Sequence, residues 1–121
     1  MKNKLQILAM IMTIVFANTM CTAAFGGGWS GLQVTDSVTH RNNRIVEVLG
    51  LYGPWANPDS CDRDTMVVLH PDKMVDAASY NETLTLLLGA HLTGREVNLY
   101  LSGCTAVGSK TYPVLTRVAV H

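Results

Sequence analysis

Apolar residues occupy alternate positions from Leu32 onward, with Val34 on the same face and mostly polar residues between them. A period of two predicts a half-buried β-strand over residues 32–39. Residues 41–43 supply a turn, and residues 45–52 resume an apolar strand pattern. We therefore expect these two strands to pair as a hairpin.

Three further strands are expected later in the chain. Residues 53–60 contain two prolines that would interrupt a strand ladder, so they are expected to form a loop. Residues 65–69 are almost continuously apolar, which predicts a short buried strand. Alternation returns at residues 96–101, with Cys104 as the expected end of that strand, and again at residues 114–120.

One helix is expected between the third and fourth strands. Ser79 and Glu82 are three residues apart and match the capping-box pattern of a helix start, ahead of a leucine-rich run. Asp76 is the alternative cap and would start the helix earlier. Gly94 is the expected stop, because glycine adopts the left-handed conformation at helix C-termini at little cost.

The elements follow the order β-β-β-α-β-β, which is the order of the five-stranded OB barrel. We therefore predict a mainly β fold with one helix, arranged as an OB-like barrel. An α+β roll, or a small open sheet with one covering helix, is the alternative arrangement. The glycine-rich residues 25–30 are expected to form a flexible N-terminal arm.

The first 24 residues show the order of features found in secretory signal peptides. Two lysines precede an apolar run at residues 5–16, and small residues follow. This run is shorter than the roughly 20 residues that a membrane-spanning helix needs. We expect cleavage after Ala24, with Ala23 as the alternative, and a single domain over residues 25–121 with no membrane insertion. An uncleaved anchor is the competing interpretation.

Removal of this leader changes the charge balance and the cysteine count. Seven basic residues remain against nine acidic ones, which disfavours nucleic-acid binding through a basic patch. Cys61 and Cys104 remain, and in an oxidising compartment such a pair predicts a disulfide. A domain of about 97 residues buries only a little over 60% of its unfolded surface, so it benefits from such a staple.

The residue spacing does not match any familiar catalytic or metal-binding pattern. Asp59, Asp62 and Asp64 lack the glycine and the later glutamate that complete an EF-hand loop. We interpret these aspartates as a solvated acidic turn, and we expect no metal site, no cofactor and no enzymatic activity. His91 is interpreted as a favourable charge near the C-terminus of the helix rather than as a base.

Aromatic residues outside the strand pattern are the stronger functional lead. Trp29 lies in the arm, while Tyr52 and Trp55 lie at the loop after the second strand. Such rings stack on sugar rings or on partner subunits. Asn57 and Arg63, close in sequence, would add directional hydrogen bonds. These five residues form the predicted ligand-binding set, with the alternative that Trp55 only plugs one end of the barrel.

Residues 81–104, NETLTLLLGAHLTGREVNLYLSGC, resemble the helix, threonine-glycine stop and following strand of AB5 toxin B subunits, especially the subtilase-cytotoxin and typhoid-toxin type. The pattern is also similar to that of small secreted bacterial proteins of unknown role. The resemblance implies a secreted OB fold from a Gram-negative bacterium that forms a homopentamer with a toxin A subunit and binds host glycans. The family's glycan-binding serine would be Ser30 or Ser37.

Two classes of function follow. The first is a secreted or periplasmic, non-catalytic binding module, in its specific form a glycan-binding B subunit whose apolar helix face is covered by neighbouring copies. The second is a monomeric periplasmic protein with a structural, inhibitory or partner-binding role, in which the aromatic residues belong to the core. A fold of this kind hosts many functions, so the site has to decide between them.

Overall fold

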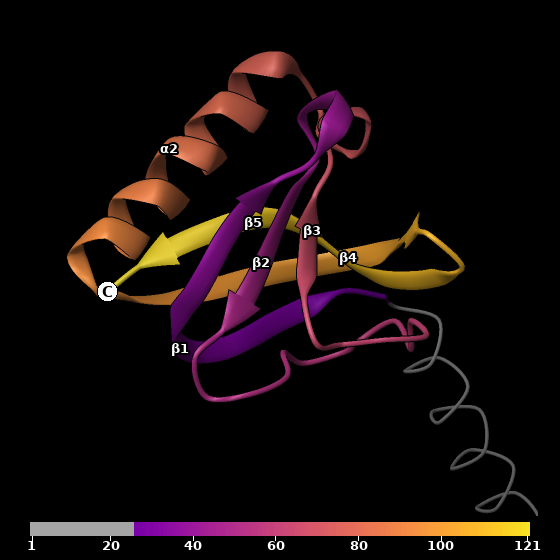
Figure 1. The fold of residues 1–121 in the computed structure, drawn as a ribbon, viewed down its shortest axis with the longest axis horizontal. Helices are drawn as coiled ribbons and strands as arrows, with labels where there is room; N and C mark the ends of the chain where they lie inside the picture. Colours follow the sequence, from indigo (N-terminus) through magenta and orange to yellow (C-terminus); the bar gives the residue numbers. More distant parts are fainter. Residues whose placement is uncertain (1–25) are drawn as a thin grey trace, which may run out of the picture.

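The computed structural model describes residues 26–121, which form five β-strands and one α-helix (Figure 1). The expected signal peptide and its cleavage site lie outside these residues. The expectation of a mainly β fold with one helix is confirmed. In chain order the elements are β1 (Gly28–His40), η1 (Asn42–Arg44), β2 (Val46–Gly50), β3 (Val67–Leu69), η2 (Pro71–Lys73), α2 (Ala77–Thr93), β4 (Glu96–Val107) and β5 (Lys110–Val120).

The five strands close into a ring in the order β1-β2-β3-β5-β4, and β4 returns to pair with β1. β1 is long enough to serve two neighbours: its first half pairs with β4 and its second half with β2. β1 and β2 are antiparallel, as the predicted hairpin requires. β3 and β5 instead run parallel and meet at the pair formed by Val68 and Val114.

Aliphatic side chains fill the interior of the ring. In β4 the alternate residues Val97, Leu99 and Leu101 are fully buried, while the residues between them are less buried. α2 packs against β1, β4 and β5 and adds Leu87 and Ala90 to the same core. Full burial of one such aliphatic side chain is worth about 1.5–3 kcal/mol, so this core is the main source of stability.

α2 begins at the alternative cap, Asp76, rather than at Ser79. The Asp76 carboxylate accepts a hydrogen bond from the backbone N–H of Ser79 at 2.7 Å, which places Ser79 in the first turn. Gly94 ends the helix in the left-handed conformation, with φ of 66°, as expected.

Pairing with neighbours makes three strands longer than the sequence predicts. Residues 28–30, expected in a flexible arm, instead begin β1, where Trp29 pairs with Tyr100. β4 continues past Cys104 to Val107, and β5 already begins at Lys110. Bulges in β4 shift its register and break the apolar alternation, which is why the sequence pattern hides this part of the strand.

The predicted disulfide is present. Cys61, in the loop between β2 and β3, is bonded to Cys104 of β4, and the two Cα atoms are 5.7 Å apart. The bond therefore fastens the β2–β3 loop to β4. Among the helices that the structure describes, none has the length and apolar character to cross a membrane.

Candidate functional site

Three side chains form a row across β1, β4 and β5. The register places Trp29 beside Tyr100, and Tyr100 beside Arg117. The two rings meet edge to face, with centroids 5.3 Å apart and planes inclined at 77°. The guanidinium carbon of Arg117 lies 5.8 Å from the centre of the Tyr100 ring, within the range of a cation–π contact. Cross-strand contacts of this kind hold the row in one arrangement.

This row forms one side of a groove whose other side is the N-terminal half of α2 with the segment before it. The groove, called the α2–β5 groove below, has a volume of about 640 Å³, within the range of small-molecule sites. Trp29 is 48% exposed there and offers an apolar ring to solvent. The lining residues are Trp29, Lys73, Met74, Val75, Ser79, Glu82, Thr83, Leu86, Tyr100, Ser102, Thr116, Arg117 and Val118.

The α2–β5 groove combines apolar surface with a few polar groups. Lys73 and Arg117 are basic and Glu82 is acidic, so the groove carries donors and an acceptor without a strong excess of either charge. Serine and threonine hydroxyls add groups that both donate and accept. Such a lining orients a polar ligand of modest size by hydrogen bonds.

A carboxylate on the β2–β3 loop fixes the strand that carries Trp29. Asp59 Oδ1 accepts a hydrogen bond from the N–H of Gly27 at 2.9 Å, and Oδ2 accepts one from the N–H of Gly103 at 2.6 Å. One side chain therefore ties the start of β1 to the bulge of β4. The disulfide joins the same loop to the residue after Gly103, so two independent contacts hold this junction.

A bulge in β1 directly follows Trp29. Gly31 takes a φ of 82°, a conformation that side chains disfavour, and its N–H donates to the side chain of Asn98 at 3.0 Å. The Ser30 hydroxyl accepts from the N–H of Leu99 at 3.0 Å and donates to the Gly31 carbonyl at 2.8 Å. Ser30, one of the two serines that the resemblance implies, is thus engaged within the bulge.

Of the five residues in the predicted ligand-binding set, the structure brings Trp29 to the groove. Trp55 is only 2% exposed, and its indole N–H donates to the carbonyl of Val48 at 3.1 Å, so it lies in the core as the plug interpretation requires. Tyr52 is 78% exposed but does not line the groove. The two aromatic residues of the loop therefore point in different directions, one inward and one to solvent.

Asn57 and Arg63 shape the β2–β3 loop. The Asn57 side chain accepts from the N–H of Cys61 at 2.8 Å and donates to its carbonyl at 2.9 Å, so both polar atoms of the amide are engaged. Arg63 is exposed, and its backbone N–H donates to the carbonyl of Thr111 at 3.0 Å. Neither residue lines the α2–β5 groove.

The aspartates around Cys61 hold backbone groups. Asp62 Oδ2 accepts from the N–H of Thr111 at 3.0 Å, and the N–H of Asp62 donates to the Thr111 hydroxyl at 3.0 Å. The hydrogen bond from the Thr111 backbone lowers the pKa of Asp62 below its ordinary value of 3.8. Within residues 26–121, no cluster of three or more acidic, histidine or cysteine side chains is arranged to hold a metal ion.

A hydroxyl and an imidazole also meet where α2 crosses β1. Thr35 Oγ1 and His91 Nδ1 are 2.8 Å apart, which is a distance at which a base can activate a nucleophile. Thr35 is only 5% exposed, and neither Thr35 nor His91 lines the α2–β5 groove. The contact instead ties the C-terminal part of α2 to β1.

A second hollow, called the loop cleft below, lies where the β1–β2 turn meets the β4–β5 turn. Its volume is about 270 Å³. Asn43 and Arg44 in this turn have φ of 62° and 63°, a left-handed conformation that is strained for residues other than glycine. The lining residues are Arg41, Asn42, Asn43, Ile45, Ala106, Val107 and Gly108.

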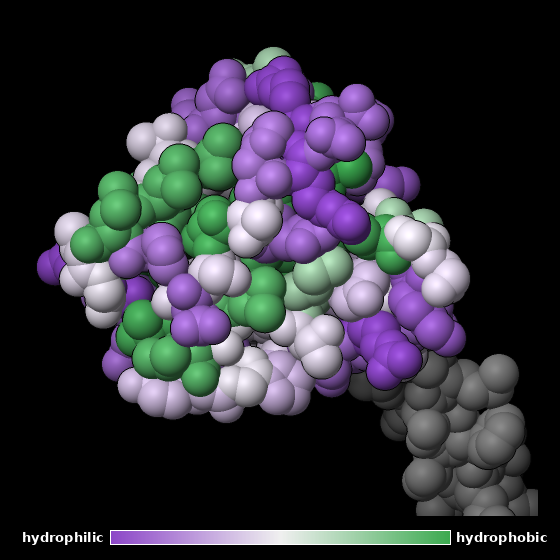
Figure 2. All heavy atoms as spheres, in the orientation of Figure 1, coloured by the Kyte–Doolittle hydropathy of each residue, from purple (hydrophilic) through white to green (hydrophobic). Residues whose placement is uncertain are grey.

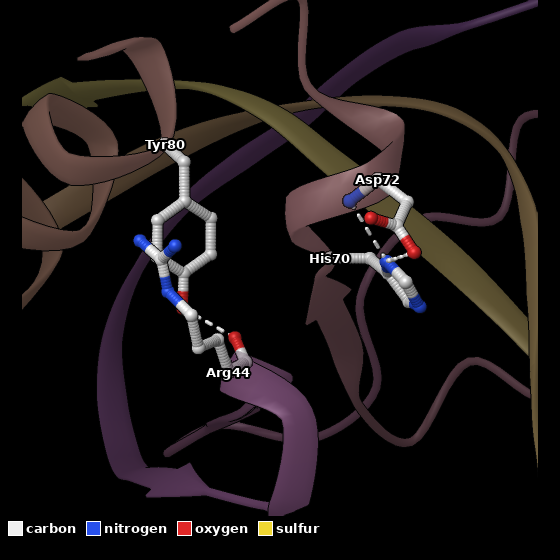
Figure 3. A network of polar contacts seen from close by, with 4 residues as sticks. All are labelled: Arg44, His70, Asp72 and Tyr80. Carbon is white, nitrogen blue, oxygen red and sulfur yellow. Dashed lines mark hydrogen bonds and ion pairs between the residues drawn. The ribbon is translucent and has the colours of Figure 1, made fainter. Parts of the chain in front are cut away.

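The first turn of α2 holds this strained turn in place (Figure 3). The Tyr80 hydroxyl donates to the carbonyl of Arg44, and the Arg44 guanidinium carbon lies 4.7 Å from the centre of the Tyr80 ring. The same guanidinium donates to the side chain of Asn81 at 3.2 Å. In the same view His70 Nδ1 accepts from the N–H of Asp72 at 3.1 Å, which shapes the turn before α2.

Sequence reasoning missed Tyr100 and Arg117, the two neighbours of Trp29. Tyr100 falls on the outward positions of a predicted strand, where an aromatic residue among polar ones is a usable signal. Arg117 gives no comparable signal, because a charged residue facing outward from a strand is ordinary. Only the strand register brings the three side chains together.

The chain was compared with protein-family models, with curated proteins and with solved structures, and no match was found in any of the three comparisons. The interpretation of the site therefore rests on its own geometry and chemistry.

Proposed function

We propose that this chain is a secreted or periplasmic, non-catalytic binding module that binds a glycan in the α2–β5 groove. The observation that carries the proposal is the half-exposed Trp29, held against Tyr100 at the edge of a groove with several hydrogen-bonding side chains. Sugars present both apolar ring faces and hydroxyl groups, and an aromatic ring beside polar groups satisfies both.

The rigidity of the aromatic row favours this proposal. Ordering a flexible side chain on binding costs about 0.5–1.5 kcal/mol, and that cost is reduced when the ring is already fixed. Trp29 is held by the Tyr100 ring and, through its strand, by the Asp59 contacts with Gly27 and Gly103. The stacking surface is therefore largely formed before a ligand arrives.

An OB-like assignment is part of the proposal. It is supported by the ring order β1-β2-β3-β5-β4, by the parallel β3–β5 contact and by the position of α2 between β3 and β4. OB folds bind oligosaccharides and oligonucleotides with the strand 2–3 face and with the two turns that form the loop cleft here. The loop cleft is therefore a second location to test for glycan binding.

The most specific form of the proposal is a B subunit of an AB5-type toxin from a Gram-negative bacterium. In that form five copies assemble, and a toxin A subunit and a host glycan are the partners. The support for it is the resemblance of residues 81–104 and the OB-like order of elements. The Cys61–Cys104 disulfide is compatible with folding outside the cytosol, in the periplasm or beyond the cell.

A monomeric periplasmic protein that binds a protein partner is the second candidate. It is favoured by Tyr52 and Leu51, which are strongly exposed at the end of β2, outside the α2–β5 groove. Exposed aromatic residues of this kind are enriched where proteins bind each other. In this case the α2–β5 groove would not bind sugars, and loss of Tyr52 would abolish capture of the partner.

A glycan array with the purified, oxidised protein tests the first candidate, followed by titration calorimetry with any glycan that binds. Trp29→Ala should abolish binding, because it removes the stacking face. Tyr52→Ala is the matched control: it also removes an exposed aromatic ring, and binding should be unchanged. Equal loss in both variants, or none in Trp29→Ala, would contradict binding in the α2–β5 groove.

A further inference from the structure

The outer face of α2 is unusually apolar for a helix that borders solvent. Leu92 is 82% exposed, and Leu86 and Leu88 are also exposed. Between Thr83 and Gly94, His91 is the sole ionisable residue, and it faces β1. Solvent-facing sides of helices normally carry charged side chains. Figure 2 shows hydrophobic residues gathered along α2.

Two threonines on α2 make this face more apolar than their type implies. The Thr85 hydroxyl donates to the carbonyl of Asn81 at 2.7 Å, and the Thr93 hydroxyl donates to that of Gly89 at 2.7 Å. Both hydroxyls therefore bond to the carbonyl one turn earlier, a back-bonding that helical threonines commonly adopt. Both hydroxyl protons are already used within the helix, so neither has to be donated to water.

Gly89 lies on the same face and has no role within the chain itself. A Cβ at this position would meet no atom within 4 Å, so nothing in the fold requires glycine there. Glycine inside a helix is destabilising relative to alanine. Close approach of another backbone is the physical situation in which a bare helix surface is favourable.

Glu82 and Arg95 are charged residues of opposite sign toward the two ends of this face, while Arg44 is engaged with Asn81 and Tyr80 and Glu96 begins β4. Asp76 and Glu82 lie at the start of α2, and Arg95 follows its end. Within the described part of the chain, neither Glu82 nor Arg95 forms an ion pair. Two parallel copies of α2 would bring Glu82 beside Glu82 and Arg95 beside Arg95, whereas two antiparallel copies can bring Glu82 of each beside Arg95 of the other.

We propose that α2 binds α2 of a second copy of this chain as an antiparallel pair related by a two-fold axis. One register brings these residues together across the pair. In it, Leu88 of one copy packs over Gly89 of the other, Leu92 packs over Thr85, and Glu82 approaches Arg95. The axis passes between positions 88 and 89. Such an isologous contact closes after two copies.

The pairing is expected to be weak. A helix of 17 residues is about 26 Å long, so one helix pair buries less than the roughly 800 Å² per partner of a standard interface. Glu82 and Leu86 line both this face and the α2–β5 groove, whereas Leu88, Gly89 and Leu92 do not line the groove, so variants at Gly89 and Leu92 test pairing separately from glycan binding. Failure of either proposal is therefore visible without the other.

Sedimentation velocity across protein concentrations, with the disulfide intact, is the first test. A mass that rises from one chain toward two supports the proposal, and a mass of one chain at every concentration overturns it. Leu92→Glu should weaken pairing about tenfold or more, because it places a charge in the contact. A five-chain assembly whose mass is unaffected by Leu92→Glu also overturns the two-fold pair.

Two sets of variants distinguish pairing from an effect on folding. Gly89→Ala should raise the thermal midpoint of the monomer and yet weaken pairing; stronger or unchanged pairing would contradict the close approach. Glu82→Arg and Arg95→Glu should each weaken pairing, and the double variant should restore it. Failure of the double variant to restore pairing would exclude the proposed register.

A cross-link gives the geometry directly. Gly89→Cys places a thiol near the axis, so non-reducing electrophoresis should show a covalent two-chain species after mild oxidation. Ala78→Cys is the control, because it lies on the same side of the helix but far from the axis. Equal cross-linking of both variants would overturn the antiparallel arrangement.

Discussion

Loss of the Cys61–Cys104 disulfide is expected to remove about 4 kcal/mol of stability. In the chain-entropy description a cross-link restricts the unfolded chain, and the effect grows with the length of the closed loop. The loop here spans 43 residues, for which the relation gives an entropy difference near 13 cal/mol/K, or about 4 kcal/mol at 25 °C. Small domains have about 5–15 kcal/mol in total, so this is a large fraction.

The double variant Cys61→Ala with Cys104→Ala tests this value. Alanine is preferable to serine, because Cys61 is buried and a serine hydroxyl there would need a hydrogen-bond partner. Urea unfolding followed by tryptophan fluorescence, to which the buried Trp55 and the half-exposed Trp29 both contribute, gives the free energy of unfolding. The midpoint should fall, and the m-value should be unchanged or larger, because the unfolded chain without the cross-link exposes more surface.

Chemical reduction of the unaltered protein is the control, since it breaks the bond without removing side-chain volume. A loss of less than about 1.5 kcal/mol in both experiments would refute the loop-entropy argument. It would mean that the Asp59 and Asn57 contacts keep the β2–β3 loop in place and that the cross-link adds little. If stability falls in the double variant but not on chemical reduction, the loss comes from the missing side-chain volume and not from the missing cross-link.

Three further changes test the packing and the helix cap. Trp55→Phe should destabilise by about 1–3 kcal/mol in urea unfolding, because it leaves the buried carbonyl of Val48 without its indole donor; no change would contradict a stabilising role of this hydrogen bond. Tyr80→Phe keeps the ring under Arg44 but removes one hydrogen bond, so a loss of about 1 kcal/mol is expected, and a loss above about 3 kcal/mol would indicate a wider disruption. The hydrogen bond from the Ser79 backbone lowers the pKa of Asp76 below the value of 3.8 expected in the unfolded chain. The ionised carboxylate therefore stabilises the folded protein above pH 3.8, and this stabilisation is lost as the pH falls through the lower pKa of the folded state. Asp76→Asn keeps the cap without titrating, and thermal unfolding followed between pH 5 and pH 2 should therefore show a weaker pH dependence; identical slopes would contradict the role of this carboxylate.

Local signals in the sequence were sufficient for most of the elements. The alternation that begins at Leu32, the apolar run of β3 and the stop at Gly94 each depend on side chains close in the chain. The start of α2 was less determined, because Asp76 and Ser79 are both good caps and three residues apart. The structure resolves this in favour of Asp76, whose carboxylate accepts from the N–H of Ser79.

Local signals failed at the start of β1 and at the end of β4. The glycine-rich start of β1 has no strand pattern, and it is a strand because β4 and the Asp59 carboxylate hold it. The continuation of β4 past Cys104 is hidden by bulges that shift its register. The partners that hold the start of β1 lie more than 30 residues away in the chain, beyond the reach of a local pattern, whereas the end of β4 pairs with the nearby start of β5 and is hidden only by its bulges.

Residue type and short-range periodicity were sufficient to predict the disulfide pair, the mainly β composition and the single helix. Which aromatic residues are exposed to solvent depends on the packing of distant segments. Trp55 and Trp29 look alike in the sequence, but Trp55 is buried because its loop folds over the core, and Trp29 faces the α2–β5 groove because β4 and β5 place Tyr100 and Arg117 beside it. Side-chain exposure depends on which strands become neighbours, and that is a property of the whole chain rather than of any segment.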